Sequence, residues 1–229
     1  MLLHNLEALD LAHVPLKGIV LSHAHYDHTG GLVAVVARYP HTPLFAHSDL
    51  LAPRYARRGL GCSSVGLPDK AQASIRERLH LSREPLQLAQ GMWTTGDISP
   101  RPFPEGRSEQ HLVRRDGRLV QDDYRDDLAL VLQTSHGIVL LCGCCHAGLR
   151  NTLGVVRSQH SAPIVAIVGG THLAQASTAE LDAVAVALRE LGSPRLYLNH
   201  CTGERALTAL ERAFGDRVSP CPAGTVLDF

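Results

Sequence analysis

Four histidine-bearing segments of this chain each follow directly on a short run of apolar residues. The runs are KGIVLS before His23, GIVLLCGCC before His146, PIVAIVGGT before His172 and RLYLN before His200. Short apolar runs rich in β-branched residues predict buried strands. In layered α/β folds the ends of such strands meet in one crevice, so residues far apart in the sequence can come together there. The pattern therefore predicts an α/β fold that gathers histidines at strand ends.

The first of these segments, SHAHYDHTGG, carries three histidines and an aspartate within six residues. Side chains alternate along an extended chain, so His23 and His25 point the same way and can bind one metal ion together. Asp27 and His28 lie on the following turn, where they can offer ligands to a neighbouring ion. The glycine pair that follows allows the backbone to pack closely beneath the site. The alternative is an exposed histidine-rich turn without a metal.

The rest of the sequence supplies helices and further strands. Apolar spacing predicts a helix at residues 32–39, and a second helix that begins at Ser177 with Glu180 as its capping partner. The runs DLALVLQT and GIVLLCGC predict a hairpin of two central strands, whereas residues 53–78 predict an irregular segment. Further strands are expected at TPLFAHS, at residues 86–93 and at residues 111–120. No repeat or linker divides the chain, so we expect a single domain over residues 1–229.

Charge and composition exclude several classes of function. The 22 Lys and Arg residues balance the 22 Asp and Glu residues, so we expect no nucleic-acid partner and no anionic membrane surface. No signal segment opens the chain, and no apolar run approaches the roughly 20 residues that span a bilayer. The six cysteines do not form the regular framework of a small secreted domain. We therefore expect reduced thiols and a cytoplasmic location.

Five motifs in order resemble one known family. HAHYDH resembles the HxHxDH signature of the metallo-β-lactamase superfamily. The motifs GMWTTGDISPR, GCCHAGLRNTL, GGTHL and NHCTG resemble one branch of it, which is similar to dihydropteroate-synthase-like proteins and includes 7,8-dihydropterin-6-methyl-4-(β-D-ribofuranosyl)-aminobenzene-5′-phosphate synthase. The likeness extends over nearly the whole chain. It implies a four-layer αββα sandwich of the α/β class, with one or two metal ions bound at the sheet edges.

Carried over residue by residue, the resemblance implies six metal ligands, namely His23, His25, Asp27, His28, His146 and His200. Zinc is the expected metal, with Mn²⁺ or Fe²⁺ as alternatives. His146 could instead only cap the following helix, and His200 could be a core histidine with satisfied hydrogen bonds. His172 either ligates, acts as a general acid or substrate contact, or is structural.

The chain departs from the family pattern at several places. GIVLLCG runs into Cys144, Cys145 and His146 where the wider superfamily has a metal-bridging aspartate, which leaves the bridging ligand open. Cys145 replaces the serine of the branch and is either a thiolate beside the metal or a small buried apolar residue. Only MLLHNLEALDLAHVPL precedes the first strand, where the branch has further strands. We expect an N-terminally shortened sandwich, which reflects a natural short form, a misassigned start or an edge that a homodimer partner covers.

The leading functional interpretation is a metal-dependent hydrolase-like enzyme, in which the metal lowers the pKa of bound water and so supplies hydroxide. Asp27 would share proton handling with metal ligation, and His172 is the candidate general acid or base. The backbone amides of residues 94–96 could meet an anionic small-molecule substrate, although a plain turn explains them as well. The alternatives are a pterin-related synthase, which is a transferase, and a metal-binding remnant without turnover. The absence of a basic stripe disfavours nucleic-acid processing.

Overall fold

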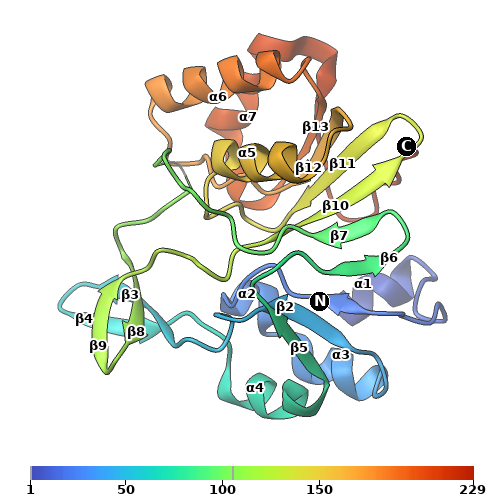
Figure 1. Ribbon diagram of the computed structural model, residues 1–229. Coiled ribbons are helices and arrows are strands. Elements are labelled where there is room, and N and C mark those ends of the chain that lie inside the picture. Colours follow the sequence, from blue (N-terminus) through green and yellow to red (C-terminus); the bar gives the residue numbers. More distant parts are fainter. Residues whose placement is uncertain (1, 105) are drawn as a thin grey trace. The chain divides into compact units, whose positions relative to one another are not determined.

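The computed structural model describes residues 2–104 and 106–229, which form two compact units (Figure 1). The first unit contains the described residues up to Arg83 together with Ser108–Asp126, and the second contains those of Glu84–Arg107 and Asp127–Phe229. The chain therefore passes from one unit to the other three times. Our expectation of a single domain over residues 1–229 stays a prediction.

The second unit is built on a seven-stranded sheet. Its strands are β6 Gln87–Ala89, β7 Met92–Thr94, β10 Ala129–Thr134, β11 Gly137–Cys142, β12 Ile164–Gly169, β13 Arg195–Leu198 and β14 Val218–Pro220. They lie in the order β14-β13-β12-β11-β10-β7-β6. Neighbours from β11 to β14 pair in parallel, whereas β10 pairs antiparallel with both β11 and β7. The predicted hairpin of two central strands is confirmed, and the four parallel strands all end at one edge.

Three α-helices pack against this sheet, namely α5 Leu149–Gln159, α6 Thr178–Glu190 and α7 Glu204–Phe214 (Figure 1). Two 3-10 helices, η2 His200–Thr202 and η3 Gly215–Arg217, lie on either side of α7. The core joins fully buried strand residues such as Leu140 and Ile167 to Val156 of α5 and Leu188 of α6. The side chain of Ser177 and that of Glu180 form the reciprocal capping box at the start of α6 that the sequence predicted.

The first unit contains a three-stranded parallel sheet of β1 Ile19–Val20, β2 Leu44–His47 and β5 Leu79–Ser82, in the order β1-β2-β5. Four α-helices belong to the same unit, namely α1 Leu2–Ala8, α2 Tyr26–Thr29, α3 Leu32–Arg38 and α4 Asp69–Ile75. Leu32 and Val36 of α3 and Ile75 of α4 pack on the buried Leu44 of the central strand. The helix predicted at residues 32–39 is thus confirmed, whereas β1 is much shorter than its apolar run suggests.

A second sheet in the first unit corrects our expectation for residues 53–78. Its strands are β3 Arg54–Arg58, β4 Gly61–Ser64, β8 His111–Arg115 and β9 Arg118–Gln121, in the order β4-β3-β8-β9. Arg58 pairs with Gly61, so β3 and β4 form a hairpin with a two-residue turn, in which Gly59 has φ of 57°. Helix α4 and the 3-10 helix η1 Arg76–Arg78 follow. The prediction of an irregular segment was therefore wrong.

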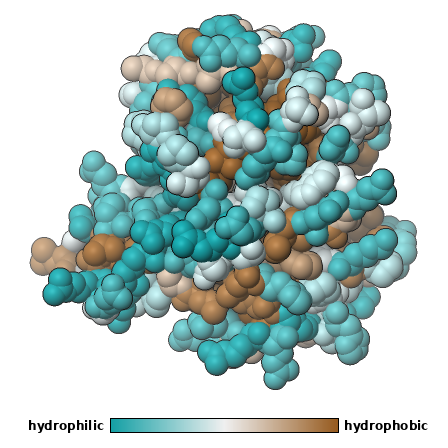
Figure 2. Space-filling view, viewed as in Figure 1, coloured by the Kyte–Doolittle hydropathy of each residue, from teal (hydrophilic) through white to brown (hydrophobic). Residues whose placement is uncertain are grey.

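Among the described residues, none of the helices is both long enough and apolar enough to cross a membrane. On the face shown in Figure 2, hydrophilic and hydrophobic side chains are interspersed. The cytoplasmic location stays a prediction.

Candidate metal centre

The three histidines of the first segment lie against one another in the first unit. The ring centroids of His23 and His28 are 4.2 Å apart, and those of His23 and His25 are 4.8 Å apart. The His23 residue is 1% exposed and His25 is 6% exposed, whereas Asp27 lies at the surface. Oδ2 of Asp27 lies 3.5 Å from Nε2 of His28. The segment therefore brings imidazole and carboxylate donors together within one turn of chain.

A buried ion network holds the backbone of this segment. The N–H of Ala24, between the first two histidines, donates to Oδ2 of Asp126 at 2.7 Å. Oδ1 of Asp126 lies 2.7 Å from Nη2 of Arg54, and Nε of Arg54 lies 3.1 Å from Oδ2 of Asp122. The three charged side chains are at most 1% exposed. Because unpaired charge is costly at such depth, the network fixes the carboxylate that holds Ala24.

The turn after the second histidine is closed by local hydrogen bonds. The hydroxyl of Thr29 and the N–H of His28 both donate to the carbonyl oxygen of His25 at 3.0 Å. A Cβ on Gly30 would lie 2.6 Å from the carbonyl oxygen of Tyr26, so this position requires glycine. The second glycine of the pair faces open space, and for that residue the expected packing role was wrong.

Two residues from the later segment of the first unit flank the ring of His25. Its centroid lies 4.9 Å from that of His111 and 6.1 Å from that of Tyr124. Nδ1 of His111 is 2.9 Å from the hydroxyl of Tyr124, which also accepts the N–H of Ser108 at 3.0 Å. Tyr124 is 1% exposed. These contacts restrict the orientation of the His25 imidazole.

In the second unit, three adjacent parallel strands lead to three histidines at one edge. β11 is followed by His146, β12 by His172 and β13 by His200. The ring centroids of His146 and His172 are 4.1 Å apart. His146 is buried, whereas His200 is exposed and is therefore not a core histidine. Within this unit, the predicted convergence of strand ends is confirmed.

A residue far from β11 in the sequence orients the ring of His146. Its Nδ1 lies 2.9 Å from the carbonyl oxygen of Gly106. Gly106 has φ of 85°, and a Cβ there would collide with the carbonyl oxygen of Cys145, so only glycine permits this approach. Helix α5 has Gly148 at its N-cap without a side-chain cap. The alternative that His146 merely caps this helix is therefore wrong.

The backbone adopts an unfavourable conformation at each of these strand ends. The φ angle is 57° at Cys145, 49° at His172 and 51° at His200. Left-handed backbone costs a residue with a Cβ about 1–2 kcal/mol. Such strain tends to gather where side chains are held for function. Three occurrences on successive strands mark this edge as the candidate site of the second unit.

A buried carboxylate also holds the backbone beside His146. Oδ2 of Asp127 accepts the N–H of Ala147 at 2.8 Å, and its Oδ1 is buried without a hydrogen bond from any described residue. Burial raises the pKa of Asp127 to about 7, against the lowering effect of the Ala147 amide. Asp126 holds the amide of Ala24 in the same way in the first unit. Two consecutive aspartates thus each fix a backbone amide next to predicted ligands.

Two cysteines lie at the same edge as His172. Cys144, His172 and Cys201 each offer a ligand atom, and these atoms lie within 4.8 Å of one another. Hydrogen bonding to Cys144 lowers the pKa of the Cys201 thiol, and hydrogen bonding to His172 adds to this effect although burial opposes it. Cys145 instead packs in the core, with Sγ 3.9 Å from the hydroxyl of Thr152. Of our two interpretations of Cys145, the small buried residue fits the structure.

The amides of residues 94–96 were a candidate anion site. The N–H of Thr94 donates to the carbonyl oxygen of Leu86 at 2.9 Å, and that of Thr95 donates to Ala129 at 3.0 Å. Because both amides already have backbone partners, they are not available to an anion. Thr94 ends strand β7 and Thr95 pairs with β10, so the expected plain turn was also wrong for these two residues.

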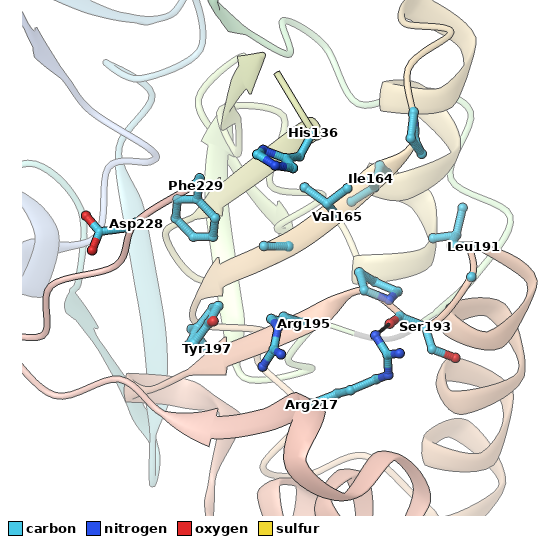
Figure 3. Close-up of a pocket in the computed structure, with 14 residues that line it drawn as sticks. His136, Ile164, Val165, Leu191, Ser193, Arg195, Tyr197, Arg217, Asp228 and Phe229 are labelled. Carbon is cyan, nitrogen blue, oxygen red and sulfur yellow. Dashed lines mark hydrogen bonds between the residues drawn. The ribbon is translucent and has the colours of Figure 1, made fainter. Parts of the chain in front are cut away.

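A cavity of about 510 Å³ opens at the opposite ends of β12 and β13 (Figure 3). Arg195, Tyr197, Arg217 and Phe229 line it, and Nη1 of Arg217 donates to the carbonyl oxygen of Ser193 at 3.1 Å. None of its lining residues is one of the predicted site residues. The cavity lies at the starts of the strands, whereas the histidines follow their ends.

Comparison with known proteins decides the family. The family model of the metallo-beta-lactamase superfamily matches residues 1–126. The chain belongs to the metallo-β-lactamase superfamily. It is 27% identical over 236 residues to 7,8-dihydropterin-6-methyl-4-(beta-D-ribofuranosyl)-aminobenzene-5'-phosphate synthase of Methanocaldococcus jannaschii. The matched region covers 100% of this chain and 80% of that protein. It is 28% identical over 197 residues to an uncharacterized protein of the same organism, which covers 85% of this chain and 72% of the relative.

A solved structure supports the same assignment. The crystal structure of a metal-dependent hydrolase of the beta-lactamase superfamily matches with a TM-score of 0.87 and 26% identity, over 99% of this chain and 84% of that one. The mixed α/β fold of the metallo-β-lactamase superfamily is thereby confirmed. So is the resemblance to the synthase-containing branch.

Membership of the metallo-β-lactamase superfamily implies a bound metal, and the residues present fit one. Imidazole and carboxylate groups gather after β1 in the first unit, and imidazole and thiol groups gather at the strand ends of the second. These are the ligand types that zinc and related ions accept. Nδ1 of His172 is buried without a hydrogen bond from the described residues. Such a polar atom needs a partner, and a metal or a substrate can supply it.

Sequence reasoning missed the residues that support the ligands. Arg54, Asp126, Asp127, Cys144 and Cys201 received no role from the motifs. The two aspartates carried a usable signal, because a carboxylate pair directly before a central apolar strand is unlike an ordinary loop. Nothing near Arg54 in the sequence shows that its side chain is buried.

Proposed function

We propose that this chain is a metal-dependent hydrolase-like enzyme that uses metal-activated water at a mono- or dinuclear site. The observation that carries the proposal is the grouping of imidazoles at strand ends, with ring centroids 4.2 Å apart for His23 and His28 and 4.1 Å apart for His146 and His172. The proposed metal ligands are His23, His25, Asp27, His28, His146 and His200.

We propose Zn²⁺ as the metal, with Mn²⁺ or Fe²⁺ as the alternatives, because histidine and carboxylate ligands suit all three. Such an ion lowers the pKa of a bound water towards 7 and so makes hydroxide available at neutral pH.

Residues of the chain orient the proposed ligands. Asp126 holds the backbone between His23 and His25, and the Gly106 carbonyl holds Nδ1 at one edge of the His146 ring.

Two residues are proposed for proton handling. Asp27 is exposed and can exchange a proton with substrate or solvent while it also ligates. His172 is half-buried with an unsatisfied Nδ1, so it can act as a general acid or base, or ligate. The proposed substrate is a small anionic molecule, and neither nucleic acid nor a membrane is a proposed partner.

A second candidate is a pterin-related synthase, a transferase that uses the same metal ligands. The 27% identity with the named synthase over the whole of this chain favours it. A third candidate, a metal-binding remnant without turnover, shares the ligands but not the activity.

We also propose a cytoplasmic location. In addition, we propose a homodimer that covers a free sheet edge, because β1 pairs only with β2 among the described residues.

The test is turnover by the purified, metal-reconstituted chain on phosphodiester, thioester and lactam substrates, and in pterin condensation. His23→Ala should reduce activity by more than the roughly 10–100-fold typical of losing an outer partner of a metal ligand. The matched control is His136→Ala, because this histidine is exposed in the β10–β11 turn. Absence of turnover in every assay with stoichiometric metal would favour the remnant, and turnover in condensation alone would favour the synthase.

A further inference from the structure

Three adjacent strands of the second unit each contribute one soft or borderline donor. Cys144 follows β11, His172 follows β12 and Cys201 follows β13, and their ligand atoms lie within 4.8 Å of one another. We propose that these three residues form a thiolate metal site that takes Zn²⁺ or a similar soft divalent ion. The site uses none of the six proposed histidine and aspartate ligands, but it includes His172, which the proposed function allows to ligate, and Cys144 also lies within 4.8 Å of ligand atoms of His146 and of His200. The thiolate donor set therefore deepens the proposed function and rests on its metal-binding edge.

The spacing of the donors is close to what zinc requires. With Zn–S of about 2.3 Å and Zn–N of about 2.0–2.1 Å, a tetrahedral site places two sulfurs about 3.8 Å apart and a sulfur and a nitrogen about 3.6 Å apart. Because no two of the three ligand atoms are more than 4.8 Å apart, each pair has to close by at most about 1.2 Å when the ion binds. Rotation about side-chain torsions alone can supply such a movement.

The backbone leaves room for the sulfur of Cys201 and points a donor at it. A Cβ on Gly170 would lie 2.8 Å from this sulfur, so a larger residue there would fill its space. The N–H of His172 donates to the same sulfur at 3.2 Å. An N–H directed at a sulfur is the contact that orients a metal-bound thiolate.

Charge also favours this donor set. Two thiolates and a neutral imidazole around Zn²⁺ carry no net charge, which limits the cost of placing the ion at a buried edge. Cys144 is 2% exposed, whereas Cys201 and His172 are half-buried, so a fourth position can be reached by water or substrate. Thiolates select zinc over manganese, magnesium or calcium. The geometry therefore points to an open zinc-type site rather than a hard-ion site.

A neighbouring cysteine, Cys145, provides a comparison with a thiol that has no role at the proposed site. Cys145 lies next to Cys144 in the sequence but packs among core side chains, and its sulfur approaches a threonine hydroxyl. Burial of small thiols in a core needs no ligand. Cys144 and Cys201 instead lie within reach of one another and of an imidazole. Cys145 is thus a matched control in the same motif.

The test uses the full chain, freed of metal and reduced with a phosphine, and titrated with Co²⁺ alone. A sulfur-to-cobalt charge-transfer band should appear in the near ultraviolet. Cys144→Ser and Cys201→Ser should each weaken cobalt binding at least tenfold and reduce the band, whereas Cys145→Ser should leave it unchanged. His23→Ala should also retain the band, which separates this site from the proposed catalytic ligands.

A second measurement on the unaltered chain does not depend on how the variants fold. Alkylation by iodoacetamide, followed by site-resolved mass spectrometry, should show that Zn²⁺ protects Cys201 but not the exposed Cys62. The proposal is overturned if the unaltered chain gives no band and no protection. It is also overturned if the band persists at full strength in the variant that carries both Cys144→Ser and Cys201→Ser.

Discussion

Arg54→Met should destabilise the first unit strongly at neutral pH. The Arg54 side chain is 1% exposed, and its guanidinium lies 2.7 Å from Asp126, 3.1 Å from Asp122 and 3.0 Å from Asp49. Methionine fills much of the same volume but leaves Asp122 and Asp126, which are at most 1% exposed, without their cation. Burial already raises the pKa of Asp122 even with the Arg54 charge beside it.

The size of the effect follows from the loss of one partner of a buried ion pair, which costs about 3–5 kcal/mol. Protonation of the stranded carboxylates limits the loss, so the lower value of about 3 kcal/mol applies at pH 7. For a chain of this length that corresponds to a fall in Tm of roughly 6–12 °C. Without the cation the folded pKa of Asp122 rises further, because burial then acts without the opposing charge of Arg54. The ionised carboxyl destabilises the folded state above its raised pKa, and this penalty disappears below the unfolded pKa. The deficit in unfolding free energy should therefore shrink as the pH falls from 7 towards 4.

Urea unfolding at pH 7 and pH 4.5 measures this deficit. The matched control is Arg125→Met, because Arg125 is half exposed and pairs with Asp123 at the surface. That control should change the unfolding free energy by no more than about 0.5 kcal/mol. The reasoning is refuted if Arg54→Met costs less than about 1 kcal/mol, the usual ceiling for an exposed pair, or if its deficit is independent of pH.

Three further predictions concern other parts of the chain. Tyr124→Phe removes a buried hydroxyl and leaves the N–H of Ser108 without its acceptor. Urea unfolding should show a loss of about 1–3 kcal/mol in unfolding free energy. Hydrogen bonds from Ser177 hold the pKa of Glu180 below its usual value. Glu180→Gln should therefore lower the unfolding free energy by about 0.3–1 kcal/mol at pH 7. Because the folded pKa is lower than the unfolded pKa, the difference in stability between the two proteins should disappear in thermal melts as the pH falls through the folded pKa. Gly106→Ala should lower stability and zinc affinity in calorimetry, whereas Gly117→Ala, which has a similar φ of 77° but open space around it, should leave zinc affinity unchanged.

Strand ends and helix caps could be predicted because their signals are local. The apolar run PIVAIVGG became β12, and the Ser177 and Glu180 pair became the capping box of α6. Hydrophobic runs and caps act over a few residues, so a single sequence displays them. For the same reason the histidines that follow β11, β12 and β13 could be assigned to one edge before the sheet order was known.

The hairpin of β3 and β4 was missed because its strands carry little apolar alternation. Arg57, Arg58 and Gly61 are exposed, and the buried residues of β3 are an arginine and an alanine. The informative signal was the glycine at the turn, since Gly59 adopts a positive φ in a two-residue connection. Polarity alone was a poor guide there, because this sheet buries a charged residue rather than an apolar one.

The support of the ligands could not be predicted because it is non-local. Asp126 reaches Ala24 across more than a hundred positions of sequence, and Arg54 lies between them in the chain. The choice between Cys144 and Cys145 likewise depends on the backbone turn at the end of β11, where Cys145 has a φ of 57°. A residue pattern does not encode that angle when the residue is not glycine.

The strained backbone after three strands raises the question of why residues other than glycine occupy these positions. At the φ angles of Cys145, His172 and His200, glycine would relieve about 1–2 kcal/mol per position. Three such positions amount to a substantial part of the roughly 5–15 kcal/mol by which a domain is stable. Backbone preference therefore argues for glycine at each strand end, and the chain has a side chain there instead. For Cys145 that side chain fills the core. His172 is only partly buried and His200 is exposed, so packing does not offset their strain. The remaining reason for an imidazole at these two positions is what its ring nitrogens can bind.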